Sequence, residues 1–459
     1  MQIVRGTSRF LAAGVVFVGL VVAVVGSLGA PLITAVAEQY GVSLAAAQWT
    51  LTIPLLSGAI ATPLLGRLGS GPRRRTVVLV TLGVVVVGSL LTVVPLPFAV
   101  LLVGRAAQGA GLGLTALMMA TARDHLDVGR SASTIALLAV ASTAGIGVGY
   151  PLAGLLTDLA GIRAAYGLGL AVTAAALVVA AIVLPTAPER PVRRVDVRGA
   201  VLLTVALLAL LLVISQTTLW HQHAGLAAAT LAGSLLLLAA WAIIEARTDE
   251  PLVDIRLLRR SAGANLVMLT CGVGMYLLLS LITRYVQTPA AAGYGFGLST
   301  FQAGLVLVPF SLLGFVAGRL VPRFRDRYGA GGLLAAGTTV VLTAFPVFAL
   351  ARGHLAGPVI AMSILGFGVG AFFAAMPAVI LSEVPAAETA GAMSVNQVVR
   401  SVGFSIGSAL GGLVLAAHTT EVFPRESGYT EAAWIGAATT AVTLLLITTS
   451  ARTTSRRTG

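Results

Sequence analysis

Residues 10–32 read FLAAGVVFVGLVVAVVGSLGAPL, a stretch without any charged side chain. A helix needs about 20 apolar residues to cross the hydrocarbon core of a membrane. Arg5 and Arg9 precede the stretch, as basic residues precede a cleaved signal peptide. The run is too long for such a peptide, however, and another apolar run soon follows. We therefore interpret it as a retained first membrane span.

The composition of the whole chain agrees with this interpretation. Its 459 residues are 57% hydrophobic and only 10% charged, whereas a typical soluble domain has about 25% charged residues. So few charges cannot cover a surface exposed to water. The 53 glycines suit helices that pack closely in lipid. The sequence thus predicts an all-α membrane protein with the lipid bilayer as its solvent.

Further apolar runs of spanning length follow the first, and no polar backbone group can be left unpaired within lipid. We count fourteen spans, and these lie at residues 10–32, 45–66, 76–95, 98–121, 132–156, 164–185, 198–216, 224–245, 262–286, 301–321, 331–350, 356–381, 391–417 and 432–450.

The basic residues support this count. All 29 are arginine, and the absence of lysine excludes a P-loop and lysine Schiff-base chemistry. The net charge of +13 lies in clusters between spans, which indicates membrane topology and argues against a nucleic-acid partner. With the N-terminus inside, 23 of the 29 arginines fall in cytoplasmic segments and three in outer loops. We expect a multi-pass protein of the cell membrane with both termini in the cytoplasm.

The N-terminal and C-terminal halves of the chain share a pattern of glycines, as expected of an internal repeat. Four matches recur at offsets between 252 and 258 residues, and they pair 41–43 with 297–299, 66–68 with 318–320, 109–113 with 366–370, and 154–155 with 412–413. Each matched span in the second half comes eight spans after its counterpart in the first half. Because eight is even, the two cross the membrane in the same direction. The sequence predicts a six-helix bundle in 1–187, a linker with two additional spans in 188–250 and a second six-helix bundle in 251–459.

Three stretches resemble the major facilitator superfamily, specifically its fourteen-span drug:proton antiporter family of the multidrug efflux type. Residues 66–75, GRLGSGPRRR, resemble the loop signature Gly-x-Leu-x-Asp-x-x-Gly-Arg-Arg, with Ser70 in place of the acid. Residues 105–111, RAAQGAG, match Arg-x-x-Gln-Gly-x-Gly, whose arginine the family implicates in proton coupling. Residues 145–154, GIGVGYPLAG, resemble the antiporter signature that ends Gly-Pro-x-x-Gly-Gly.

The resemblance and the depth of polar residues together define the candidate site. We assign the substrate or proton pathway to Arg105, Gln108, Trp49, Asn396, Gln397 and Arg400. We assign the conformational motifs to Gly66, Arg67, Arg74, Gly109, Gly145, Gly149, Pro151 and Gly154. No span centre contains an acid, so a titrating carboxylate would have to be Glu38 or Asp158 in the outer vestibule.

The function predicted from these observations is export of a small amphipathic or hydrophobic compound by alternating access, coupled to proton antiport. We expect a monomer with no cofactor and no metal, since the chain has one cysteine and scattered histidines. Three alternatives stay open: a facilitator or importer on the same fold, a transport-inactive sensor or scaffold, and a membrane-embedded enzyme. The enzyme would require a dense group of His, Asp or Glu at one membrane face.

Overall fold

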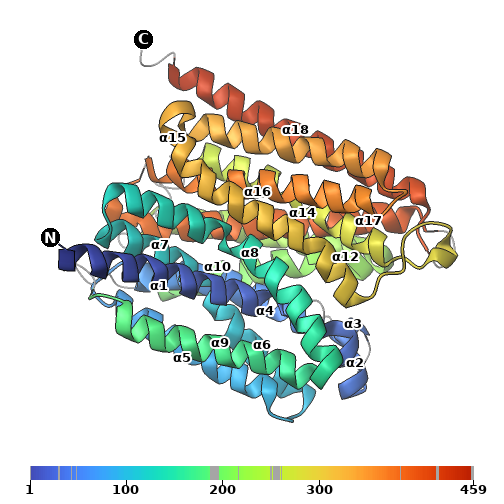
Figure 1. Ribbon diagram of the computed structural model, residues 1–459, viewed down its shortest axis with the longest axis horizontal. Helices are drawn as coiled ribbons and strands as arrows, with labels where there is room; N and C mark the ends of the chain where they lie inside the picture. The colour runs from blue at the N-terminus through green and yellow to red at the C-terminus, as the bar shows by residue number, and fades with distance from the viewer. Residues whose placement is uncertain are drawn as a thin grey trace.

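The chain is built from helices that run roughly side by side (Figure 1). The computed structural model describes residues 2–28, 32–42, 44–47, 49–186, 196–215, 217–248, 251, 259, 261–382, 384–419 and 423–455. The helices are α1 (Gln2–Ser27), α2 (Ile33–Tyr40), α3 (Leu44–Ala47), α4 (Trp49–Leu68), α5 (Arg74–Val93), α6 (Phe98–Ala110), the short 3-10 helix η2 (Gly111–Gly113), α7 (Leu114–His125), α8 (Val128–Ala160), α9 (Ile162–Val183), α10 (Val197–Ser215), α11 (Thr217–Gln222), α12 (Ala224–Glu245), α14 (Ala262–Gln287), η3 (Ala290–Ala292), α15 (Thr300–Ala351), α16 (Ala356–Ser382), η4 (Ala386–Glu388), α17 (Thr389–Ala417) and α18 (Glu426–Ser455).

The described helices account for the fourteen predicted crossings. Eleven helices are long and apolar enough to cross a membrane, and α8 and α10 contain shorter apolar stretches. The helix α15 has 52 residues and supplies two crossings, because its backbone turns at Gly329, where φ is +68°. Large apolar side chains such as Val80, Ile182 and Leu236 remain exposed, as expected where lipid covers the outer faces.

Two predicted boundaries differ from the structure for local reasons. The expected loop between residues 321 and 331 is helical up to the turn at Gly329, so α15 continues beyond the apolar run. The fourth crossing is interrupted by η2, which separates α6 from α7. Three glycines within five residues, Gly109, Gly111 and Gly113, weaken the α-helical preference at that point.

The chain folds into two six-helix bundles, one from the blue-to-green helices and one from the yellow-to-red helices of Figure 1. Their glycine contacts repeat between the halves. Gly66 of α4 lies against Ser394 of α17, and its counterpart Gly318 of α15 lies against Val140 of α8. Each contact joins one bundle to the other. The repeat seen in the sequence therefore corresponds to equivalent positions at the interface between the bundles.

The two additional spans, α10 and α12, pack against each other, and α10 also packs against α4 and α17. Leu211 of α10 lies in a cluster with Leu56 of α4, and Val213 lies in a cluster packed by Val402 and Ile406 of α17. The helix α10 thus bridges α4 of the first bundle and α17 of the second. The expected divisions at 187/188 and 250/251 involve residues outside the described ranges and remain predictions.

Both chain termini lie toward the same end of the molecule, at the left of Figure 1. We call this the terminal end and the opposite side, where α2 and α3 lie, the distal end. An even number of crossings requires this arrangement. The turn between α4 and α5 lies at the terminal end, and so does the turn within α15.

Candidate functional site

Arg105 occupies the centre of a polar network inside the first bundle. Its side chain, on α6, has no exposed surface. Nε donates to the carbonyl oxygen of Thr50 at 2.8 Å, and Nη1 donates to the Gln108 side-chain oxygen at 2.7 Å and to the Val25 carbonyl at 3.4 Å. Arg105 and Gln108 thus meet across one turn of their helix, as residues three apart can.

The Thr50 carbonyl is available because Pro54 follows four residues later in α4. Proline has no N–H group, so the carbonyl four positions before it loses its helical partner. The Arg105 guanidinium supplies a donor in place of that N–H. The proline and the arginine together fix α4 against α6, a pairing that sequence reasoning missed although Pro54 is its signal.

Gln108 extends the network to α5 and α9. Its Nε2 atom donates to the Ser89 hydroxyl at 3.0 Å and to the Thr92 hydroxyl at 3.4 Å, and Thr173 of α9 also donates to Ser89. These side chains are at most 5% exposed. Sequence reasoning missed the three hydroxyl residues, because isolated Ser and Thr within apolar helices have no distinguishing pattern.

Two glycines of residues 145–154, Gly145 and Gly149, pack α8 against α1. Gly145 lies against the backbone and side chain of Ala23, and Gly149 lies against Ser27. The Ser27 hydroxyl donates to the carbonyl oxygen of Gly145 at 3.1 Å. A side chain at either glycine would displace α1, so both positions require close approach.

The same stretch also packs across the interface between the bundles. Gly154 lies against Phe301 at the start of α15, and Gly304 of α15 lies against Pro151. A Cβ atom added at Gly304 would lie 3.2 Å from the Pro151 nitrogen. The predicted antiporter stretch therefore contacts its own bundle through one set of residues and the second bundle through another.

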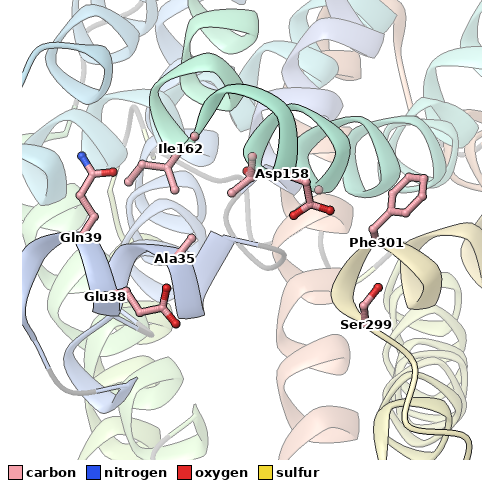
Figure 2. A pocket seen from close by; sticks show the side chains of 10 residues that line it. Ala35, Glu38, Gln39, Asp158, Ile162, Ser299 and Phe301 are labelled. Carbon is pink, nitrogen blue, oxygen red and sulfur yellow. The ribbon is translucent and has the colours of Figure 1, made fainter.

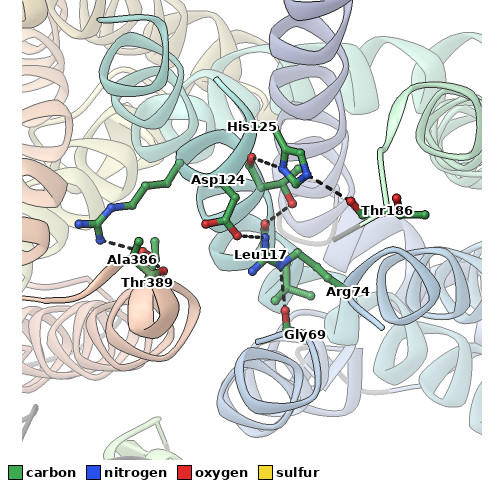
Figure 3. A network of polar contacts seen from close by, with 10 residues as sticks. Gly69, Arg74, Leu117, Asp124, His125, Thr186, Ala386 and Thr389 are labelled. Atoms are coloured by element: carbon green, nitrogen blue, oxygen red, sulfur yellow. Dashed lines mark hydrogen bonds and ion pairs between the residues drawn. The ribbon is translucent and has the colours of Figure 1, made fainter. Parts of the chain in front are cut away.

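Arg74, the first residue of α5, is held by an acid from another part of the chain (Figure 3). Its Nη1 atom lies 2.7 Å from Oδ2 of Asp124 in α7, and both side chains are 4% exposed. Nε donates to the Gly69 carbonyl at 2.8 Å. Ser70, at the acid's place in the loop signature, donates to the carbonyl of Arg67. Asp124 thus supplies the carboxylate that the loop itself lacks.

Arg123, next to that acid, binds the second bundle at the terminal end. Nη1 donates to the Thr389 hydroxyl at 2.7 Å, and Nη2 donates to the carbonyl oxygens of Leu381 and Val384 at 3.2 and 3.1 Å. The acceptors lie at the end of α16, just beyond it and at the start of α17. One guanidinium group therefore fastens the two bundles together. We call these contacts the Arg123 clasp.

A pocket at the distal end contains both of the predicted vestibule acids. Its volume is about 650 Å³, and Glu38 of α2 and Asp158 of α8 lie on opposite walls (Figure 2). Ser299, which precedes α15 of the second bundle, also lines it. Nearby in α2, burial raises the pKa of the Tyr40 phenol, and the positive charge of Arg163 opposes that rise. The pocket lies where the two bundles meet.

A second pocket of about 420 Å³ opens at the terminal end, beside the Arg123 clasp. Its charged side chains are Arg123 and Arg325, one from each bundle. Most of the remaining lining is apolar and includes Ile135 and Pro377. The two pockets differ in charge, with carboxylates at the distal end and guanidinium groups at the terminal end.

Comparison with known sequences settles the family. The sequence model of the Major Facilitator Superfamily matches residues 15–408 and 264–458. The chain belongs to the Major Facilitator Superfamily. Family membership makes it a transporter and not a membrane-embedded enzyme. The resemblance of residues 66–75, 105–111 and 145–154 to motifs of this superfamily led to the right family.

Relatives of this superfamily member are named for drug export. It is 31% identical over 352 residues to the cephamycin export protein CmcT of Amycolatopsis lactamdurans, covering 73% of this chain and 71% of the relative. It is 28% identical to the tetracenomycin C resistance and export protein of Streptomyces glaucescens, covering 85% and 72%. It is 27% identical to a multidrug resistance protein B homolog of Mycobacterium tuberculosis, covering 82% and 70%. The chain is thus a superfamily member of the drug efflux type.

A solved structure shares the fold of this transporter. The human organic anion transporter MFSD10 (TETRAN) superimposes with a TM-score of 0.70 over 96% of this chain and 99% of that one. The two sequences are 16% identical, so the likeness concerns the fold alone. It agrees with the two-bundle architecture described above.

The other predicted pathway residues of the transporter fall into separate sets of contacts. Arg400 of α17 donates to the Gln397 side-chain oxygen at 2.6 Å and lies 5.0 Å from the Phe373 ring centroid. Asn396 donates to the side-chain oxygen of Asn265 in α14 at 3.1 Å. Trp49 packs against the cluster that joins α4 to α10. Arg105 and Gln108 form a set of their own. The structure therefore joins four of the six residues in two pairs, while Asn396 and Trp49 contact residues outside the predicted set.

Proposed function

We propose that this transporter exports a small amphipathic or hydrophobic compound by alternating access, with protons moving in the opposite direction. The observation that carries the proposal is the interface of α8 with α15, where Pro151 and Gly154 of one bundle pack directly on Gly304 and Phe301 of the other. Small residues on both sides let two rigid bundles approach closely without interlocking side chains. Such a seam suits rocking of one bundle against the other.

The orientation of the proposed transporter follows from charge. By the span count, 23 of the 26 arginines outside the spans fall in segments on the same side as the two termini, and an excess of arginine marks the cytoplasmic side of bilayers. The terminal pocket with Arg123 and Arg325 would then receive substrate from the cytoplasm. Its apolar walls and two guanidinium groups suit an amphipathic molecule with a neutral or negative polar group. We propose a monomer in the cell membrane with both termini cytoplasmic.

The proposed proton carriers are the two acids of the distal pocket, Glu38 and Asp158. Both are exposed and reach the solvent of the outer vestibule directly. They also lie at the interface, beside Ser299 of the second bundle, so closure of the distal end would move them into a less aqueous environment. Burial favours the protonated form of a carboxylic acid, and this links proton binding to closure.

Transport into proteoliposomes under an imposed pH gradient tests the proposal. The probes are tetracenomycin C and a cephamycin, the compounds for which two relatives are named. We expect gradient-driven uptake by the native chain. We expect strongly reduced uptake for Arg105→Ala and loss of the pH response for the double variant Glu38→Gln/Asp158→Asn. The exposed pair Asp127 and Arg130 supplies a matched control, because Asp127→Asn removes a carboxylate outside the pocket.

The outcomes separate the remaining alternatives. Uptake that does not respond to the gradient would identify a facilitator, and no uptake of a wide panel of compounds would favour a sensor or scaffold. If the double variant keeps the full pH response, the two acids are not the coupling groups. Accessibility of engineered cysteines in intact cells would test the orientation.

A further inference from the structure

The positive charge of Arg105 is buried in the first bundle, and no residue that the structure describes brings an opposite charge into contact with it. Its hydrogen bonds end on the carbonyl oxygens of Thr50 and Val25 and on the amide oxygen of Gln108, all of them neutral groups. A guanidinium group stays protonated in proteins. A charge taken out of water without a counter-charge costs several kcal/mol. Carbonyl dipoles offset only part of that cost.

Two donors in this region have no acceptor within the described part of the chain. They are Nη2 of Arg105 and the hydroxyl of Tyr166, and both atoms are buried. Tyr166 belongs to α9, has no exposed surface, and lies in one cluster with Leu101, which precedes Arg105 by about one helical turn. Buried polar groups without a partner normally mark a bound water or ion.

The chemistry of these two groups points to an anion. A guanidinium N–H can only donate, and a phenol can donate through its O–H, so a single acceptor between the two groups would satisfy both. A water molecule could accept these bonds but would leave the charge uncompensated. The surroundings of Tyr166, including Leu28, Ile162 and Ala165, are apolar and fully or almost fully buried.

We propose that Arg105 Nη2 and the Tyr166 hydroxyl form a binding site for a small monovalent anion, with chloride as the physiological ligand. The site would join α6 to α9, and Arg105 already holds α1 and α4 through Val25 and Thr50. Anion binding therefore stabilises the first bundle as a unit. This inference does not depend on what the transporter carries or on its coupling ion.

Thermal unfolding of the purified full-length chain tests the site without any transport. The melting temperature is measured in sodium chloride and in sodium gluconate at equal ionic strength. We expect a saturable stabilisation by chloride in the native chain. We expect Tyr166→Phe to weaken apparent chloride affinity by roughly tenfold or more, because it removes one hydrogen bond to a charged ligand. Arg105→Gln should abolish the chloride effect.

The matched control is Tyr328→Phe, since Tyr328 is 54% exposed and should leave the chloride response unchanged. A crystal soaked in bromide should show an anomalous peak beside the Arg105 guanidinium. Equal melting in the two salts, or a chloride response of full strength in Tyr166→Phe, would overturn the proposal and leave water as the partner. If Arg105→Gln does not fold, Tyr166→Phe and the bromide peak still decide the question.

Discussion

Removal of the Arg123 clasp should open the terminal end of the transporter. The guanidinium makes three hydrogen bonds to the second bundle, to the Thr389 hydroxyl and to the carbonyls of Leu381 and Val384. None of these bonds can persist if the bundles separate at this end. The substitution Arg123→Gln shortens the side chain and removes its charge, so it should eliminate all three.

The size of the effect follows from the environment of the side chain. Arg123 is half-buried, so each bond contributes less than the roughly 1.5–3 kcal/mol of a bond to a fully buried charged group. A net contribution of about 0.7 kcal/mol for each bond gives about 2 kcal/mol for the clasp. Since 1.4 kcal/mol corresponds to a factor of ten, the population open at the terminal end should increase about thirtyfold.

Spin labels across the terminal pocket would measure this shift. Val128 of the first bundle and Ser382 of the second both line the pocket and are exposed, so Val128→Cys and Ser382→Cys can be labelled. The native Cys271 is buried and should not react. We expect a longer distance component to grow in Arg123→Gln. The control is Arg130→Gln, which removes a partly exposed arginine seven residues away. An unchanged distance distribution in Arg123→Gln, or an equal change in the control, would refute the reasoning.

Two further substitutions probe the same end of the molecule. Breaking the buried pair with Asp124→Asn should lower the free energy of unfolding by roughly 3–5 kcal/mol, because Arg74 loses its counter-charge; the double variant Arg74→Met/Asp124→Leu should recover most of the loss in thermal melts. Gly66→Ala should destabilise the closed interface by about 1–3 kcal/mol through collision with Ser394, and Ser394→Gly should restore it. The helical Gly331 has open space around it, so Gly331→Ala should have no such effect on labelling at the terminal end.

Much of the fold was predictable because lipid imposes strong constraints on sequence. Apolar length fixed the number of crossings, and the periodic glycines indicated two related bundles. The turn at Gly329 was harder to locate, since helix α15 continues through polar residues that a hydropathy count assigns to a loop. Boundaries of this kind depend on local backbone geometry more than on the apolar pattern.

The candidate site was predictable only where a motif marks it. The Arg105–Gln108 pair follows from its spacing, but its partners do not. Thr50 is recruited through its backbone, and Asp124 meets Arg74 from 50 positions away in the chain. Such contacts arise from tertiary packing. They depend on which helices lie side by side and on where those helices begin and end, and the local sequence pattern does not give this. The Arg123 clasp belongs to the same class, since two of its three acceptors are carbonyls.

The two bundles repeat the same backbone contacts but differ in charge at one equivalent position. Gly109 packs against Pro54 in the first bundle, and Gly366 packs against Phe310 in the second. Where the first bundle has Arg105, the corresponding position of the second has Met362, which is fully buried. The second bundle therefore has an uncharged side chain at that position, whereas the first has a buried guanidinium. The proposed anion would therefore act on the first bundle selectively.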